Sequence, residues 1–212
     1  MRFKALKLAL PLSVLLATTF DVNAADFSFT GNFTNDNDVP TFNFSIGVPS
    51  TVILRTWSYA GGTNATWNTI ERGGFDPVLT LFDRSTGALL SENDDGNGSV
   101  ATDINGSDFD AFLTASLASG NYTVSIQQND NFALGPNLSD GFSQEGIANM
   151  NFNDGFVDRF NDEQRDAHWA LDILNVNSAV LIASPVPEPE TYSMMLAGLA
   201  FIGFALRRRK TS

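Results

Sequence analysis

Cysteine is absent from the chain, histidine occurs once, and no lysine lies between Lys7 and Lys210. Without cysteine there are no disulfides, so the fold must rest on a hydrophobic core. The same lack, together with the single imidazole of His168, excludes a cysteine protease and a zinc site of the usual type. Gly141–Gly146 misses the Gly-x-Ser-x-Gly spacing of a serine nucleophile by one residue. We therefore expect no enzymatic activity, although a carboxylate pair for sugar hydrolysis stays open.

Positive charge is also scarce in the middle of the chain. Residues 25–186 hold five arginines against 21 acidic residues, a formal charge of −16 within a chain total of −12. This charge repels nucleic acid and anionic lipid headgroups, so we expect no nucleic-acid partner. Acidity of this strength favours solubility, cation binding, or both.

Residues 1–24 have the pattern of a secretory signal peptide. Arg2, Lys4 and Lys7 precede an apolar stretch, and Val22-Asn23-Ala24 places short residues before a cleavage point. We predict cleavage after Ala24, so that the following domain is exported.

The other end of the chain has the pattern of a membrane anchor. Residues 192–206 carry no charge and are followed by a basic tail, 207–212. A helix of that length spans roughly 22 Å, less than the ~30 Å hydrocarbon core. Arginine side chains extend such a span by reaching towards the headgroups. The pattern predicts a transmembrane helix over 192–206 with a cytoplasmic tail; the alternative is a buried C-terminal core helix.

A linker over residues 179–191 precedes this helix and contains a Pro-Glu-Pro box. The box, the apolar helix and the basic end follow one another in the order of a three-part signal. Its residues are Val186, Pro187, Glu188, Pro189, Arg207, Arg208 and Arg209. This tail resembles the PEP-CTERM sorting signal of Gram-negative bacteria over residues 187–210. The resemblance implies recognition by the transpeptidase exosortase, an inner-membrane anchor before processing, a final place at the cell surface or outside the cell, and an exopolysaccharide-producing host.

Between the two ends, apolar residues alternate with polar ones. Thr41–Ile46 alternates strictly, and shorter alternations recur around Phe29, Tyr122 and Trp169. Period two is the mark of half-buried strands, and Gly/Asn/Asp-rich breaks separate them. The pattern predicts an all-β fold over residues 25–178, a single antiparallel β-sandwich of jelly-roll type.

Two local features are also predicted within this domain. Residues 113–117 and 122–127 flank Ala118-Ser119-Gly120-Asn121 and should form a hairpin. Residues 128–166 are rich in Asn, Asp and Gly, which predicts a long loop with one helical turn at 162–166.

Three stretches of this domain occur in an order known from a family. They are residues 74–83 (GFDPVLTLFD), 93–96 (NDDG) and 117–124 (LASGNYTV). Over residues 27–176 the chain resembles the bacterial pre-peptidase C-terminal domains, and more closely an uncharacterised group of such domains in PEP-CTERM proteins. The resemblance implies a β-sandwich without catalytic activity of its own; some of those domains are adhesive or calcium-stabilised.

Asn93, Asp94, Asp95 and Asn97 are the candidate metal ligands. Calcium takes about six to eight oxygen ligands, and this loop offers several within a few residues. It is no EF-hand, because Ile104 stands where the bidentate glutamate is required. The alternative is an ordinary turn, since Asn, Asp and Gly suit tight turns without an ion. Asn35–Asp38 could add ligands if the first strand lies beside the loop.

Trp57, Tyr59 and Trp67 are the candidate ligand-binding residues, because aromatic faces stack on sugar rings. The alternative places Trp57 and Tyr59 in the core. Together these features predict a non-catalytic surface or extracellular-matrix protein, sorted by exosortase and associated with exopolysaccharide or biofilm assembly. The alternative function is a carbohydrate-binding module that retains matrix polysaccharide.

Overall fold

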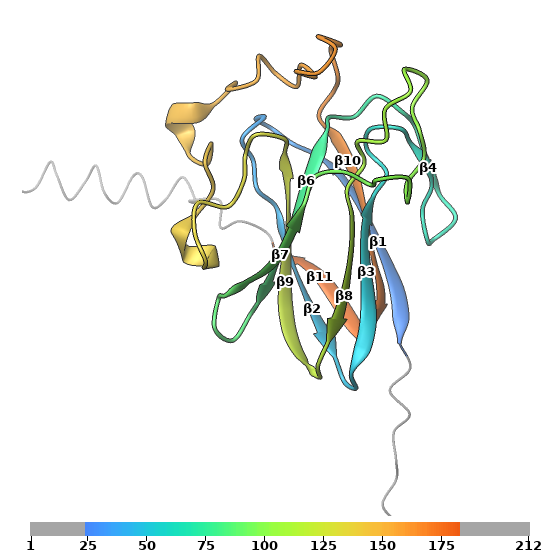
Figure 1. The fold of residues 1–212 in the computed structure, drawn as a ribbon, viewed down its shortest axis with the longest axis vertical. Helices are drawn as coiled ribbons and strands as arrows, with labels where there is room; N and C mark the ends of the chain where they lie inside the picture. Colours follow the sequence, from blue (N-terminus) through green and yellow to red (C-terminus); the bar gives the residue numbers. More distant parts are fainter. Residues whose placement is uncertain (1–23, 183–212) are drawn as a thin grey trace, which may run out of the picture.

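The computed structural model describes residues 24–182 (Figure 1). The predicted signal peptide, the Pro-Glu-Pro box, the transmembrane helix and the basic tail lie outside the described residues, except that Ala24 is included. Within residues 24–182 no helix is long and apolar enough to cross a bilayer. The described part of the chain is all-β, as predicted, with two short 3₁₀ turns as its helical elements.

Two antiparallel sheets form a β-sandwich-like arrangement. One sheet has the order β1 (Ala25–Asn32), β10 (His168–Val176), β3 (Ser50–Thr56) and β8 (Phe112–Leu117). The other has the order β11 (Ser178–Ile182), β2 (Thr41–Ile46), β9 (Gly120–Gln128), β6 (Pro77–Asp83) and β7 (Leu89–Asn93). A two-stranded ribbon joins β4 (Gly62–Thr63) to β5 (Thr69–Ile70). Strand β11 includes residues 179–182, which the sequence assigned to the linker.

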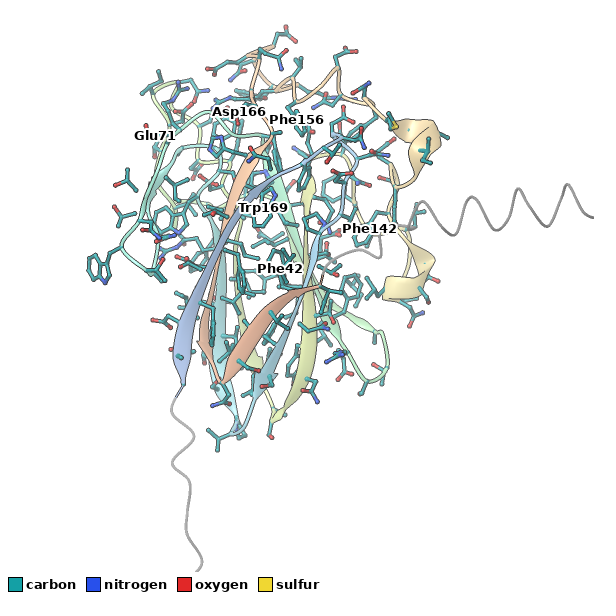
Figure 2. The ribbon with its side chains drawn as sticks, turned by 180° about the vertical axis from the view of Figure 1, so that it is seen from behind. Phe42, Glu71, Phe142, Phe156, Asp166 and Trp169 are labelled. Carbon is teal, nitrogen blue, oxygen red and sulfur yellow. The ribbon has the colours of Figure 1, made fainter. Side chains whose placement is uncertain are left out.

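Phenylalanine from both sheets builds the shared core. In β2 the predicted alternation is confirmed, with Phe42, Phe44 and Ile46 buried between half-buried polar residues. The ring of Phe42 lies 4.9 Å from that of Phe29 on β1 and 5.6 Å from that of Trp169 on β10, across the gap between the sheets (Figure 2). Burying each such side chain stabilises the fold by about 1.5–3 kcal/mol.

Strands β6 and β9 are buried on both faces rather than on one. Their outer face is covered by the β9–β10 connection, residues 129–167, which crosses the flank of the five-stranded sheet and continues over one end of the sandwich (Figure 1). Phe142 of this connection meets Phe82 of β6 edge-on, with ring centroids 6.3 Å apart. This cover explains why polar residues of β9 such as Gln127 are fully buried.

The hairpin predicted between residues 113–117 and 122–127 is wrong. Strand β8 pairs with β3, and β9 pairs with β2 and β6, so the turn between β8 and β9 carries the chain from one sheet to the other. Tyr122 fixes this crossing, because its hydroxyl donates to the Ala118 carbonyl at 2.9 Å while its ring stacks on Phe44. Each strand then faces the core from its own sheet.

The predicted long loop is confirmed, but the helical turn at 162–166 is wrong. The 3₁₀ turns of the connection lie instead at Leu138–Asp140 and Ile147–Asn149. Asp162 has a φ of 59°, a left-handed conformation that cannot continue a right-handed helix. The segment instead bridges back on itself, pairing Val157 with Gln164.

Candidate functional site

A cavity of about 200 Å³ opens where β6 begins and β9 ends. The register places Pro77 opposite Gln128, so Asp76, just before β6, lies beside the residues that follow β9. The β9–β10 connection supplies much of the remaining wall. Aspartates and phenylalanines dominate the lining: Asp76, Asp95, Asp130 and Asp158, with Phe109, Phe156 and Phe160. We call this space the Asp76 cavity.

Asp76 is the most perturbed carboxyl of the cavity. Its Oδ2 accepts a hydrogen bond from Asn129 Nδ2 at 2.8 Å, whereas its buried Oδ1 has no partner. Burial raises the pKa of Asp76 well above its ordinary value, and the nearby charges of Asp95, Asp158 and Asp94 act in the same direction. A buried carboxylate among other carboxylates is an electrostatic cost of the fold.

Gln128 adds a second orphaned acceptor. Its side chain lines the cavity and is only 2% exposed, and its Oε1 has no hydrogen-bond partner. Leaving a buried acceptor without a donor costs about 1–3 kcal/mol. The neighbouring Gln127 shows the usual situation, because its amide contacts Thr80 Oγ1 and Ser125 Oγ.

The candidate calcium loop reaches this cavity through only one of its four predicted ligands, Asp95. Burial raises the pKa of Asp95, helped by the charges of Asp94 and Asp108. Asn97 is exposed at a left-handed turn, and the Oδ1 of Asn93 is buried without a partner. Within residues 24–182 no group of three or more histidines and carboxylates could hold a metal ion. Calcium at this loop stays a prediction.

The acidic segment Asn35–Asp38 forms hydrogen bonds to the β9–β10 connection and not to the candidate calcium loop. Asp36 accepts hydrogen bonds from the backbone amides of Phe152 and Asn153, at 3.2 and 2.9 Å. Asn37 Nδ2 donates to the Gln144 carbonyl at 2.9 Å. These contacts attach the β9–β10 connection to the segment that follows β1. They thereby hold Asn153, a residue of the cavity lining, in place.

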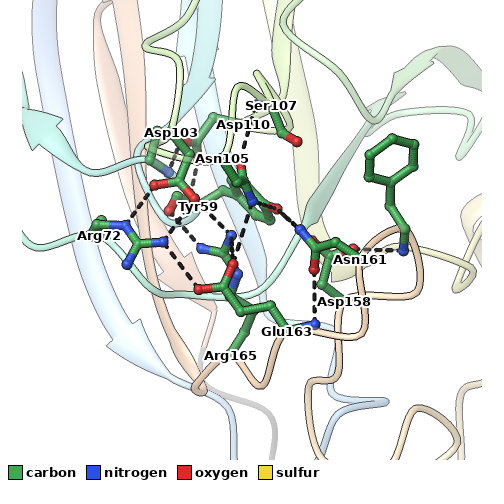
Figure 3. A network of polar contacts seen from close by, with 12 residues as sticks. Tyr59, Arg72, Asp103, Asn105, Ser107, Asp110, Asp158, Asn161, Glu163 and Arg165 are labelled. Carbon is green, nitrogen blue, oxygen red and sulfur yellow. Dashed lines mark hydrogen bonds and ion pairs between the residues drawn. The ribbon is translucent and has the colours of Figure 1, made fainter.

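Next to the cavity lies a network of paired charges, formed by Arg72, Asp103, Glu163 and Arg165 (Figure 3). Asp103 accepts from Arg72 Nε at 2.6 Å and from Arg165 at 2.8 Å, while Glu163 accepts from the same two arginines. The hydrogen bond from Arg72, followed by that from Arg165, holds the pKa of Asp103 well below its ordinary range despite burial. We call these four residues the charge network.

Tyr59 joins the charge network to the cavity. The guanidinium of Arg165 lies 3.6 Å from the centre of the Tyr59 ring, and the Tyr59 hydroxyl donates to Asp158 Oδ2. The other carboxylate oxygen of Asp158 accepts from the Phe160 amide at 2.8 Å. Asp158 is therefore fixed in the cavity wall by contacts on both oxygens.

The three predicted ligand-binding aromatics do not form one surface. Tyr59 is fully buried, so it is not available to stack on a sugar. Trp57 is half-buried, donates from Nε1 to Asp172 at 2.7 Å, and carries Arg55 over its ring at 4.2 Å. Trp67 alone of the three presents an open ring, with 87% of the residue exposed between β4 and β5.

His168 opens β10 and is half-buried there. Its Nδ1 contacts Asp166, and its Nε2 contacts the Glu71 carbonyl at 3.0 Å. Both ring nitrogens thus connect strand β10 to neighbouring loops.

Sequence reasoning missed Asp76, Gln128 and Phe160 as members of one site. Asp76 belongs to a stretch that resembles a family motif, and Gln128 is the first residue of the predicted loop over 128–166. Their convergence depends on the β6–β9 register and on the path of the β9–β10 connection.

Comparison with known proteins bears on the C-terminal tail. No curated protein matches the chain. The PEP-CTERM protein-sorting motif matches residues 185–210, a span that contains the predicted Pro-Glu-Pro box and arginines. The chain therefore carries the sorting motif of an exported protein that is anchored in the membrane and then processed by exosortase.

Proposed function

We propose that the protein is a non-catalytic component of the cell surface or extracellular matrix, associated with exopolysaccharide or biofilm assembly. The match of the sorting motif at residues 185–210 carries this proposal. The −16 formal charge of residues 25–186 supports it, because strong acidity keeps an exported domain soluble and attracts cationic groups.

In this proposal the signal peptide, residues 1–24, directs export, and a helix over 192–206 holds the chain in the inner membrane until exosortase acts. The antiparallel sheets support a sandwich of jelly-roll type. Residues 27–176 resemble the pre-peptidase C-terminal domains, some of which are adhesive, and an adhesive role would suit a matrix component.

Cell fractionation with and without exosortase tests the proposal. We expect the chain at the surface or in the matrix when exosortase is present, and uncleaved in the inner membrane when it is absent. Replacing Pro187 and Pro189 with alanine should reproduce the exosortase-minus pattern. Ser184→Ala, just outside the matched motif, is the control and should sort normally. An unchanged distribution without exosortase would refute the proposal.

A carbohydrate-binding module is the second candidate, favoured by the exposure of Trp67. The turn that carries this ring is ordered, because Asn64 Oδ1 accepts from the Thr66 and Asn68 amides at 3.1 and 2.9 Å. An open indole on a hydrogen-bonded turn suits stacking on a sugar ring. Pull-down on the native exopolysaccharide should retain wild type and Val48→Ala, an exposed apolar control, but lose Trp67→Ala. Equal retention of Trp67→Ala would remove this candidate.

A further inference from the structure

The Asp76 cavity has more carboxyl groups than its own cations can pair. Within residues 24–182 neither Asp76 nor Asp95 forms an ion pair with an arginine or histidine. Arg159, the cation of the lining, is already bound to Asp130 at 3.0 Å and to Asn153 Oδ1 at 2.7 Å. Asp76 and Asp95 are therefore left without a cationic partner in the cavity.

The orphaned atoms of the cavity point to the type of group that is missing. Asp76 Oδ1 and Gln128 Oε1 are both buried acceptors without a donor. Burial of an unpaired carboxylate is costly, and so is burial of an unpaired amide oxygen. A ligand that completes this site must bring positive charge and hydrogen-bond donors.

Size and lining separate an organic cation from a bare metal ion. The volume of about 200 Å³ is several times the roughly 30 Å³ that a water molecule takes in the liquid. Phe109, Phe156 and Phe160 supply no metal ligands, but their faces suit both a cation and the apolar side of a ring. No group of three carboxylates or histidines in the described part of the chain could hold a metal.

The walls divide into a fixed floor and an open rim. Phe156 stacks on the core residue Phe75, with ring centroids 5.5 Å apart, so its position is set by the fold. Phe160 is 77% exposed, and its ring meets Phe109 edge-on at 5.3 Å. An ammonium group can therefore lie beside Asp76 while the body that carries it packs against Phe160.

We propose that the Asp76 cavity binds a protonated primary amine borne on a sugar ring, the chemistry of a deacetylated amino sugar. Asp76 and Gln128 accept hydrogen bonds from the ammonium group, and the Phe160 ring packs against the sugar. A lysine side chain offers the same ammonium, but the open Phe160 ring favours a ring-shaped ligand. The choice of a sugar rests on the proposed association with exopolysaccharide. It implies that this exopolysaccharide contains deacetylated amino sugars.

Titration of the full-length chain in a neutral detergent tests the inference. A glucosamine trimer should bind saturably at about 0.15 M salt, where long-range attraction to an acidic protein is largely screened. The N-acetylglucosamine trimer, which has no ammonium, should not bind. Asp76→Asn should raise the Kd at least about tenfold, because a charge-assisted hydrogen bond is lost. Glu71→Gln removes one charge outside the cavity and should leave the Kd unchanged.

Several results would overturn the inference. These are the absence of saturable binding to wild type, equal affinity for the acetylated trimer, and an unchanged Kd for folded Asp76→Asn. Binding of a lysine tripeptide but not of the glucosamine trimer would refute the sugar assignment. Saturable calcium binding that Asp76→Asn abolishes, without glucosamine binding, would make the cavity a metal site instead. Sorting by exosortase is measured separately and would survive any of these failures.

Discussion

Two polar regions lie along the β9–β10 connection, and they differ in whether their buried charges are paired. In the charge network, Asp103 and Arg165 are both buried and each meets opposite charges within 3 Å, although the Nε of Arg165 is itself buried without a partner. In the Asp76 cavity, Asp76 Oδ1 and Gln128 Oε1 are buried and have no partner. The first region therefore stabilises the fold through paired charges, whereas the two unpaired acceptors of the second are the observation behind the proposed ligand.

The largest expected effect comes from breaking the paired region. Arg165→Met keeps the volume of the side chain but leaves Asp103 and Glu163 with one cation between them, and removes the guanidinium from the Tyr59 ring. Removing one partner of a buried pair costs about 3–5 kcal/mol. Urea unfolding should show a loss of that size, whereas Arg84→Met, at an exposed position, should stay within about 0.5 kcal/mol of wild type.

A loss below about 1 kcal/mol for Arg165→Met would mean that the charge network does not hold the connection. The charge network and the Asp76 cavity would then differ in their contacts but not in what they contribute to the free energy of unfolding.

The charge network should also fail at low pH. The folded-state pKa of Asp103 lies below its unfolded value, so its contribution to stability is fully present above the unfolded pKa of about 3.9. It is lost as the pH falls through the folded pKa. Asp103→Asn should lower the free energy of unfolding by about 2–3 kcal/mol at pH 6, since hydrogen bonds to charged groups are removed. The gap from wild type should narrow below pH 4; a gap independent of pH would contradict this.

The sequence predicted the strands better than their partners. Alternation in Thr41–Ile46 predicts which face of β2 is buried, because period two is a local property. It does not tell whether β8 and β9 share a sheet, because either arrangement buries the same residues. The helical turn at 162–166 failed for a local reason, the left-handed backbone of Asp162, which aspartate tolerates but does not require.

The candidate site was predictable only in part. The composition of the loop at Asp94-Asp95 suited either a calcium site or an ordinary turn, and calcium there stays a prediction; of the four proposed ligands, Asp95 lines the cavity. Gln128 carried no signal, because an amide at the end of a strand is unremarkable until its oxygen is found without a donor. Tyr59 was paired with Trp57 by sequence spacing, but its contacts are with Arg165 and Asp158, more than 90 residues away.

In the Asp76 cavity, removing a charge should raise the free energy of unfolding, whereas in the charge network it lowers it. Asp76→Asn removes a half-buried carboxylate whose Oδ1 is buried without a partner and whose pKa is raised by burial and like charges, so it should stabilise the chain by about 1–2 kcal/mol at pH 7. The folded-state pKa exceeds the unfolded one, so the cost in wild type develops as the pH rises from the unfolded pKa to the folded pKa and is complete above it. Below the unfolded pKa the variant and wild type should melt alike. Destabilisation by Asp76→Asn at pH 7 would show that Asp76 Oδ1 already has a partner.

The smallest expected effect is also the sharpest comparison, because it uses two adjacent glutamines of β9. Gln127 is fully buried with its amide paired to Thr80 and Ser125, whereas Gln128 is equally buried with an orphaned Oε1. Gln127→Met should cost about 1–3 kcal/mol, since it leaves those hydroxyls without the amide. Gln128→Met removes an unsatisfied atom at similar volume, so urea unfolding should show no loss or a gain below about 1 kcal/mol. Equal losses at both positions would mean that the Gln128 amide is satisfied, and the case for a missing donor in the cavity would then rest on Asp76 alone.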